Sequence, residues 1–189
     1  MQIKPPALLL IDLQQGLSGP ADFYGGNRNH PDAEEKAGQL LALWRNRRWP
    51  VYHVRHSSTT AGSPLRPDQP GFAFHEAVRP VDGEPVITKS VNSAFIGTDL
   101  LHQLRSAGVE TLVVAGLTTQ HCVSTSVRMA GNLGFRTYLI EDATAAFPAT
   151  TPGGETFDAD LVHKIALAEL HGEFATVVSS DAMLQHLAR

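Results

Sequence analysis

The apolar residues of this chain fall into short runs that have the length of β-strands. Two of these runs, 7–11 (ALLLI) and 112–115 (LVVA), are apolar at every position, which is typical of strands buried on both faces of a sheet. The run at 51–55 alternates in the manner of a second strand. We predict six strands in all, at residues 7–11, 51–55, 85–88, 112–115, 137–140 and 173–178.

Between these runs, apolar residues recur at the spacing of amphipathic helices. The stripe of the first such segment consists of Ala37, Leu40, Leu41 and Trp44. We expect this helix to begin at Asp32, which forms a capping box pattern with Glu35, and to stop at Pro50. Further helices are predicted at residues 98–107, 123–133, 160–168 and 181–187.

Strands that alternate with helices, with no hairpin signal between strands, predict an α/β fold. We expect one domain over residues 1–189, with a six-stranded, mostly parallel, doubly wound sheet and helices on both of its faces. Residues 16–29, 57–83 and 143–157 are predicted loops. The loop 57–83, with SPLRPDQPG at its centre, is long enough to predict an ordered, functional segment near a site.

Composition limits the kinds of molecule expected to bind this protein and the cellular compartment in which it is expected. The chain is 42% hydrophobic and 18% charged, as globular proteins are, and its net charge of −4 argues against nucleic acid and anionic membranes as partners. No apolar run approaches the roughly 20 residues of a membrane span. A single cysteine excludes an intrachain disulfide and fits a reducing compartment, and the start of the chain lacks a signal-peptide pattern. We therefore expect a cytoplasmic protein.

The single cysteine, Cys122, follows the apolar run 112–115 across Gly116 and a polar turn, and it stands where helical periodicity begins. Backbone N–H groups at a helix start are unpaired and carry partial positive charge. They can lower the pKa of a thiol and later bind an oxyanion. A lone cysteine is more often a small buried apolar residue, so a catalytic role requires partners.

Asp12 and Lys89 are the candidate partners, because each stands at the carboxyl end of a predicted strand. In a parallel sheet these ends share one edge, where ligands bind. An aspartate can take the thiol proton and later protonate a leaving amine, and a lysine can stabilise the thiolate. Each residue alone has an ordinary alternative, a turn cap for Asp12 and a solvated charge for Lys89.

Three segments, ALLLIDLQ, ITKSVNSAF and VVAGLTTQHCV, resemble the signature blocks of the isochorismatase-like cysteine hydrolases, in the order of that family. The resemblance runs from Ala7 to Val178. It implies a three-layer α/β/α sandwich and hydrolysis of a C–N bond in a small amide, ureido or carbamoyl substrate. In that reaction Cys122 is the nucleophile, Asp12 the general base and acid, and Lys89 the cationic partner.

The resemblance implies further site features around these three residues. A cis peptide is expected at Leu117–Thr118, with the backbone N–H groups of Thr118 and Cys122 forming an oxyanion hole. Asn92 and Phe95 match family positions near the substrate, although a turn amide and a core aromatic residue are the alternative. His56, at a strand tip, is a candidate pocket residue. Gln14 is another, provided that the strand continues past Asp12.

No metal or cofactor is expected. Nicotinamidases, which are members of the same family, have an Asp-x-His metal cluster after the second strand, and the matching positions here are His56-Ser57-Ser58. His53 and His56 face opposite sides of a strand and cannot chelate together. His121 adjoins the cysteine in sequence, but adjacent helical residues do not face each other, so it receives no catalytic role.

Two alternatives to an amidohydrolase stay open on the sequence. One is vinyl-ether hydrolysis of an isochorismate-type substrate, in which Asp12 protonates the substrate and the thiol is dispensable. The other is a non-catalytic binding module on the same fold. The expected partners are a small-molecule substrate, whose identity the sequence does not reveal, and further copies of the chain, because the resemblance implies a homo-oligomer.

Overall fold

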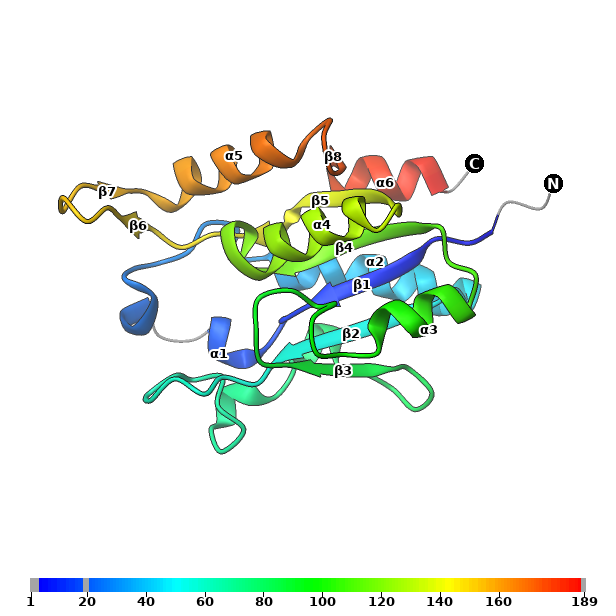
Figure 1. Ribbon diagram of the computed structural model, residues 1–189, viewed down its shortest axis with the longest axis horizontal. Helices are drawn as coiled ribbons and strands as arrows, with labels where there is room; N and C mark the ends of the chain where they lie inside the picture. The colour runs from blue at the N-terminus through cyan, green and yellow to red at the C-terminus, as the bar shows by residue number, and fades with distance from the viewer. Residues whose placement is uncertain (1–3, 19–20, 188–189) are drawn as a thin grey trace.

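The computed structural model describes residues 4–18 and 21–187, and a six-stranded parallel sheet forms its centre (Figure 1). The strand order is β3-β2-β1-β4-β5-β8, and every neighbouring pair is parallel. The order reverses between β1 and β4, so a crevice is expected at the carboxyl ends of these two strands. The bounds are β1 Ala7–Ile11, β2 Val51–His56, β3 Val86–Lys89, β4 Thr111–Leu117, β5 Arg136–Ala145 and β8 Thr176–Val178.

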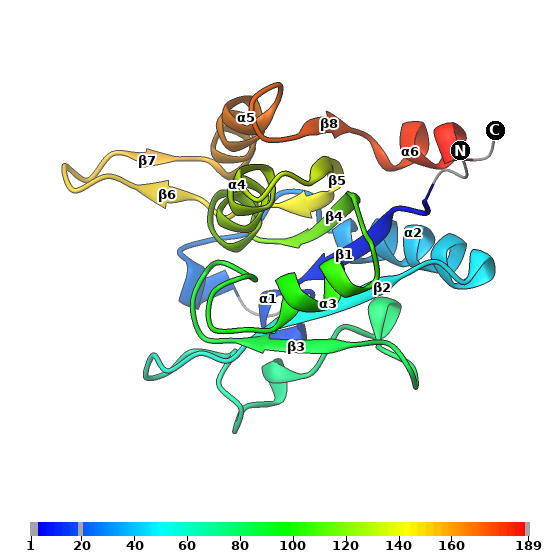
Figure 2. The same ribbon diagram turned by 45° about the vertical axis from the view of Figure 1, so that its right-hand side comes forward.

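Helices cover both faces of the sheet, which gives the expected three-layer α/β/α fold (Figures 1 and 2). Leu8 and Leu10 of β1 pack with α2 and α6 on one face, and Leu9 and Ile11 pack with α3 and α4 on the other. Successive residues of a strand point to opposite faces, so a fully apolar strand fills two cores. The helices are α2 Ala33–Arg47, α3 Leu100–Ser106, α4 Ser124–Asn132, α5 Ala159–Leu170 and α6 Ser180–Leu187.

The segments predicted as loops contain short elements. The helical turns are α1 Gln15–Ser18, η1 Ala21–Tyr24, η2 Pro70–Phe72 and η3 Glu76–Val78. A small antiparallel hairpin of β6 Ala149–Thr150 and β7 Thr156–Phe157 lies within the predicted loop 143–157, apart from the main sheet. Every neighbouring pair in the main sheet is parallel, so the prediction that no hairpin joins its six strands is confirmed. The separate hairpin was not predicted, because two-residue strands have no detectable alternation of apolar positions. Among the described residues, no helix has the length and apolar character to cross a membrane.

The capping of two helices differs from the sequence prediction, although Asp32 is the N-cap of the first, as expected. Asp32 is the N-cap residue of α2, but its side chain makes no capping hydrogen bond, so the predicted capping box is absent. Helix α5 is capped by Asp158, whose carboxylate accepts a hydrogen bond from the backbone N–H of Leu161, rather than beginning at Asp160. Both sites offer acidic residues close together, and only the backbone geometry decides which one caps.

Gly116 allows β4 to approach β1 at the point where the two strands end. Its φ angle is +144°, and a Cβ atom there would lie 2.1 Å from the carbonyl oxygen of Ile11. Ile11 and Gly116 are paired in the sheet register, and Asp12 follows directly. The missing side chain therefore allows the end of β1 and the segment that carries Cys122 to lie against each other.

We predict that Gly116→Ala destabilises the fold by about 3 kcal/mol, because the new methyl group collides with backbone atoms that have no free space. Gly134→Ala is the matched control. Gly134 also has a positive φ angle, of +84°, but no atom lies within 4 Å of the added methyl group. Only the backbone strain of about 1 kcal/mol is expected there. Urea unfolding followed by circular dichroism measures both, and equal losses would contradict the packing argument.

Candidate active site

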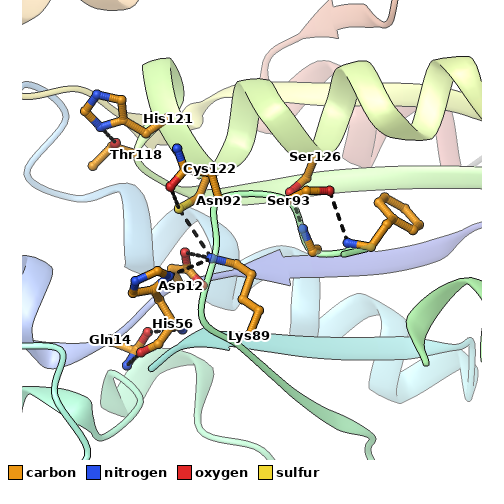
Figure 3. Close-up of polar contacts among 12 residues, drawn as sticks. Asp12, Gln14, His56, Lys89, Asn92, Ser93, Thr118, His121, Cys122 and Ser126 are labelled. Carbon is orange, nitrogen blue, oxygen red and sulfur yellow. Dashed lines mark hydrogen bonds and ion pairs between the residues drawn. The ribbon is translucent and has the colours of Figure 1, made fainter. Parts of the chain in front are cut away.

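The structure brings Asp12, Lys89 and Cys122 together at the carboxyl edge of the sheet (Figure 3). Asp12 directly follows β1, and its φ angle of +52° turns the chain out of the strand. Lys89 is the last residue of β3. Cys122 lies in η4 Thr119–Val123, a single π-helical turn between β4 and α4, and so precedes the α-helix whose first turn it was expected to occupy.

The ammonium group of Lys89 is the centre of this cluster. Its Nζ atom lies 2.6 Å from Asp12 Oδ2, 3.3 Å from Cys122 Sγ and 3.2 Å from His56 Nδ1 (Figure 3). The side chain of Lys89 is 0% exposed and that of Asp12 is 1% exposed. A lysine ammonium has three N–H donors, so these three acceptors satisfy it completely.

His56 is the member of the cluster whose contact with Lys89 the sequence did not predict. It ends β2, beside Lys89 in the register of the sheet, and it also lines the cavity described below. Burial and the charge of Lys89 lower the pKa of His56, so the ring is neutral near pH 7. Because Nδ1 faces an ammonium group, it is the accepting nitrogen.

Burial and neighbouring charges set the protonation states of Asp12 and Cys122. Burial raises the pKa of Asp12, and the Lys89 ammonium opposes this effect. Burial and the carboxylate of Asp12 raise the pKa of Cys122 to about 12, against the opposing effect of Lys89. The predicted lowering of the thiol pKa was therefore wrong for the resting protein. Sequence reasoning counted the helix start and the lysine, but could not measure burial or the nearness of the carboxylate.

The second oxygen of Asp12 is available to a proton. Its Oδ1 atom is buried and has no hydrogen-bond partner among the described residues, whereas Oδ2 is bound to Lys89. A buried acceptor without a partner is costly, and a proton from the neighbouring thiol would supply one. The resting arrangement is thus a protonated sulfur beside a carboxylate that can accept its proton.

A cavity of about 490 Å³ opens above Cys122 and Asp12. This volume suits a small organic molecule. The loop 57–83 contributes Ser58, Thr60, Ser63 and Leu65 to its lining, so the expectation that this loop is ordered near the site is confirmed. Aromatic residues of two other loops, Tyr24 and Phe147, also line it. Sequence reasoning missed these two, because loop residues have no periodicity from which to predict their direction.

Of the two residues expected near the substrate after Lys89, only Asn92 is at the cavity. Its Oδ1 atom lies 3.8 Å from Cys122 Sγ. Phe95 is 9% exposed and packs in the core against Phe135, with ring centroids 6.2 Å apart. The alternative of a core aromatic residue is therefore the correct one for Phe95, because the chain turns inward between these two positions.

Gln14 does not line the cavity either, because the chain leaves the strand geometry at Asp12. Its amide is fully buried and holds β2 instead: Nε2 donates to the carbonyl groups of His56 and Phe72, and Oε1 accepts from the N–H of His56 at 2.7 Å. Gln14 thereby fixes the backbone of the residue that accepts a hydrogen bond from Lys89.

The remaining histidines near the site have separate environments. His121 lines the cavity with its Nδ1 atom 3.3 Å from Thr118 Oγ1, at some remove from Lys89 (Figure 3). His53 is 0% exposed, contacts Glu84 at 2.7 Å and packs edge-on against Phe74. These are the contacts of a structural residue: Phe74 belongs to the loop 57–83, and Glu84 directly follows it.

Three side chains of the cluster have the spacing of a metal site. Ligand atoms of Asp12, His56 and Cys122 all lie within 4.8 Å of one another. However, the Lys89 ammonium already contacts all three of these side chains. The residues therefore do not fit a cation, because the lysine supplies the positive charge at the position that a metal would need.

The segment before Cys122 has the backbone form that the resemblance implied. The Leu117–Thr118 peptide bond is cis. Thr118 lines the cavity, and its carbonyl oxygen accepts hydrogen bonds from the N–H groups of His121 and Val123, which close the turn around Cys122.

Comparisons with known proteins identify the family. Residues 6–182 match the isochorismatase domain. The chain belongs to the isochorismatase family. A family member from Bacillus subtilis is 46% identical over 178 residues, which cover 94% of each chain. The crystal structure of a protein assigned to this family from Chromobacterium violaceum superimposes with a TM-score of 0.92 at 46% identity, covering 100% of this chain and 96% of the other.

Family members of named activity establish that this isochorismatase-family protein is a hydrolase. Maleamate amidohydrolase from Pseudomonas putida is 32% identical over 200 residues, covering 98% of this chain and 89% of its own. A streptothricin hydrolase from Streptomyces noursei is 30% identical over 182 residues, covering 94% of this chain and 63% of its own. Both names describe hydrolytic enzymes, so the binding-module alternative is wrong.

We predict that removal of the two charged neighbours has opposite effects on alkylation of Cys122. The Asp12 carboxylate raises the pKa of the thiol and Lys89 lowers it. Asp12→Asn therefore increases the thiolate fraction at a given pH, moving the alkylation midpoint down by about 1 pH unit or more, and Lys89→Met decreases that fraction. Iodoacetamide labelling rates between pH 6 and 10, followed by intact mass, measure both changes, as faster labelling of Asp12→Asn and slower labelling of Lys89→Met than of the unmodified protein at the same pH.

For the unmodified protein, the labelling rate should still rise above pH 9, beyond the midpoint of roughly 8.5 for a free cysteine. A rate that levels off below pH 8 would contradict a raised pKa of the Cys122 thiol. So would an Asp12→Asn variant that labels more slowly than the unmodified protein. Circular dichroism of both variants confirms that the comparison is made on folded chains.

Proposed function

We propose that this isochorismatase-family hydrolase is a metal-independent cysteine amidohydrolase that cleaves the C–N bond of a small amide, ureido or carbamoyl compound. The observation that supports this proposal is the contact of one buried ammonium group with a thiol and a carboxylate at the floor of a cavity. The three groups are a nucleophile, a base and a fixed positive charge, which together are the requirements of covalent amide hydrolysis.

In the first step the sulfur of Cys122 attacks the substrate carbonyl carbon while its proton passes to Oδ1 of Asp12. The thiol pKa of about 12 makes a free thiolate rare in the resting site, so proton transfer accompanies the attack. Lys89 stabilises the negative charge as it moves between carboxylate and sulfur. The carbonyl oxygen becomes an oxyanion, which we assign to the N–H groups of Thr118 and Cys122.

In the second step the tetrahedral intermediate collapses, and its C–N bond breaks. Asp12 gives the proton to the leaving nitrogen, which departs as ammonia or an amine, and a thioester remains on Cys122. Water then attacks the thioester, with Asp12 accepting one of its protons, and the proton returns to the sulfur. The sum is one amide bond and one water converted to an acid and an amine.

Two further residues have supporting roles in this proposal. His56 accepts a hydrogen bond from Lys89 as a neutral ring, so it orients the ammonium without removing its charge. Asn92, beside the sulfur and exposed to the cavity, offers its amide to the substrate. The name of maleamate amidohydrolase supports amide hydrolysis as the reaction type in the family.

We predict that Cys122→Ala abolishes ammonia release from a panel of small amides and ureides, lowering kcat/KM by about 10³-fold or more, because no second nucleophile replaces the sulfur. A coupled ammonia assay measures the loss, and thermal unfolding checks the fold. Activity that survives the substitution would refute covalent catalysis. It would favour the alternative, vinyl-ether hydrolysis with Asp12 as the proton donor.

We also propose that the chain forms a homo-oligomer. Val86, Val91 and Ile96 are 41%, 44% and 50% exposed, and they belong to the edge strand β3 and the segment that follows it. Exposed apolar residues along an edge strand favour association. Light scattering after size exclusion should therefore give a mass at least twice the 20.4 kDa of one chain. A single-chain mass would refute the proposal.

A further inference from the structure

The cavity above Cys122 has an almost uncharged lining. Among the described residues that form it, only Asp12 is acidic, and none is lysine or arginine. The Lys89 ammonium lies beneath the lining and is fully engaged by its three acceptors. Burial lowers the pKa of His56 and of His121, so both lining histidines are neutral near pH 7. The lining therefore offers no free positive charge to an anionic substrate.

A second buried cation, Arg28, lies outside the lining of this cavity. It lines an adjoining cavity of about 390 Å³, where its Nη2 atom is paired with the buried carboxylate of Glu34 and its Nη1 atom has no partner among the described residues. Leu17 and Phe147 line both cavities and so stand between them. An anion bound over Cys122 would meet these two apolar side chains rather than the guanidinium group.

Aromatic side chains form one wall of the cavity. The ring of Tyr24 stacks on Phe147, with centroids 4.5 Å apart and an interplanar angle of 19°. Phe23 packs edge-on against Tyr24 at 5.0 Å. Leu17 and Leu65 extend the apolar surface. Such a wall favours a flat, apolar group on the ligand.

The hydroxyl group of Tyr24 is the polar feature of this wall. It is buried and has no hydrogen-bond partner within residues 4–18 and 21–187. Burial raises the pKa of this hydroxyl, and so do the negative charge of Asp12 and the charge that Cys122 acquires when it ionises, so the hydroxyl stays protonated and lies within the field of the cluster. A buried donor without a partner is costly, and a ligand oxygen or nitrogen can supply that partner.

Resting on the proposed amidohydrolase function, we infer that the substrate is an uncharged amide with a flat, apolar group, which lies on the Tyr24–Phe147 wall and accepts a hydrogen bond from Tyr24. An amide that carries a carboxylate on the same group is rejected. Its charge would lose hydration on entering the cavity and would gain no counter-charge in return.

Iodoacetamide and iodoacetate test the charge preference without any hydrolysis. In both reactions the sulfur of Cys122 displaces iodide, and the reagents have nearly the same shape but differ by one negative charge. We expect the ratio of their rates at Cys122, iodoacetamide over iodoacetate, to exceed the ratio for the neutral thiol N-acetylcysteine amide by about 10-fold or more. An equal or smaller ratio would overturn the inference.

Thr60 provides a matched pair of variants, because it is exposed and lines the cavity. Thr60→Lys adds the missing positive charge and should lower the iodoacetamide-to-iodoacetate ratio several-fold. Thr60→Gln, of similar length and neutral, should leave the ratio unchanged. If the lysine variant has the same ratio as the glutamine variant, the charge of the lining does not select the ligand, and the inference is wrong.

Hydrolysis of a neutral and an anionic amide provides the second test. The neutral amide methyl 4-carbamoylbenzoate should release ammonia with a higher kcat/KM than the anionic amide 4-carbamoylbenzoate. Tyr24→Phe should raise KM for the neutral amide while leaving the ratio of alkylation rates unchanged. Preference for the anionic amide would overturn the inference. If neither amide nor any other small amide reacts while the ratio of alkylation rates holds, the proposed amidohydrolase function fails and the preference for a neutral ligand stands.

Discussion

The buried ammonium of Lys89 is the charge on which the site depends. A buried charge is tolerated only when it is paired and its donors are satisfied, and here the three acceptors come from the end of β1, the end of β2 and the turn after β4. His56 and Lys89 are neighbours in the register of the parallel sheet. A shift of one residue in this register would move the lysine to the other face of the sheet and leave Asp12 without its partner.

Backbone packing between β1 and β4 supplies the second constraint. The sulfur reaches Lys89 only because β4 runs against β1 up to Gly116, where no side chain would fit. Directly beyond that contact, the positive φ angle of Asp12 and the π-helical turn at Cys122 end the regular strand geometry of both segments. Regular strands thus set where the reacting groups begin, and two short irregular segments set how they face each other.

The sequence predicted the parts of the molecule that follow from periodicity and from strand ends. Apolar runs located all six strands of the sheet, and parallel topology converts strand ends into neighbours, which is why Asp12, Lys89 and Cys122 were found together. Side-chain direction after a strand end has no such rule, so Phe95 and Gln14 were misplaced. The thiol pKa was wrong because it depends on burial, which only the three-dimensional structure reveals.

The difference between strand ends and loops also separates the chemistry of the site from its selectivity for a substrate. Asp12, Lys89 and Cys122 lie at or just beyond the ends of strands that are held in the core, whereas most of the cavity lining comes from loops before α2, after β2 and after β5. Changes in these loops reshape the cavity without disturbing the ion pair beneath it. Family members can therefore share a reaction type while differing in substrate, and the name of maleamate amidohydrolase, which is 32% identical, does not by itself assign a substrate to this chain. In the proposed reaction the amide bond meets groups that the fold itself positions, but the rest of the substrate meets residues such as Tyr24 and Phe147, whose directions no sequence pattern predicts.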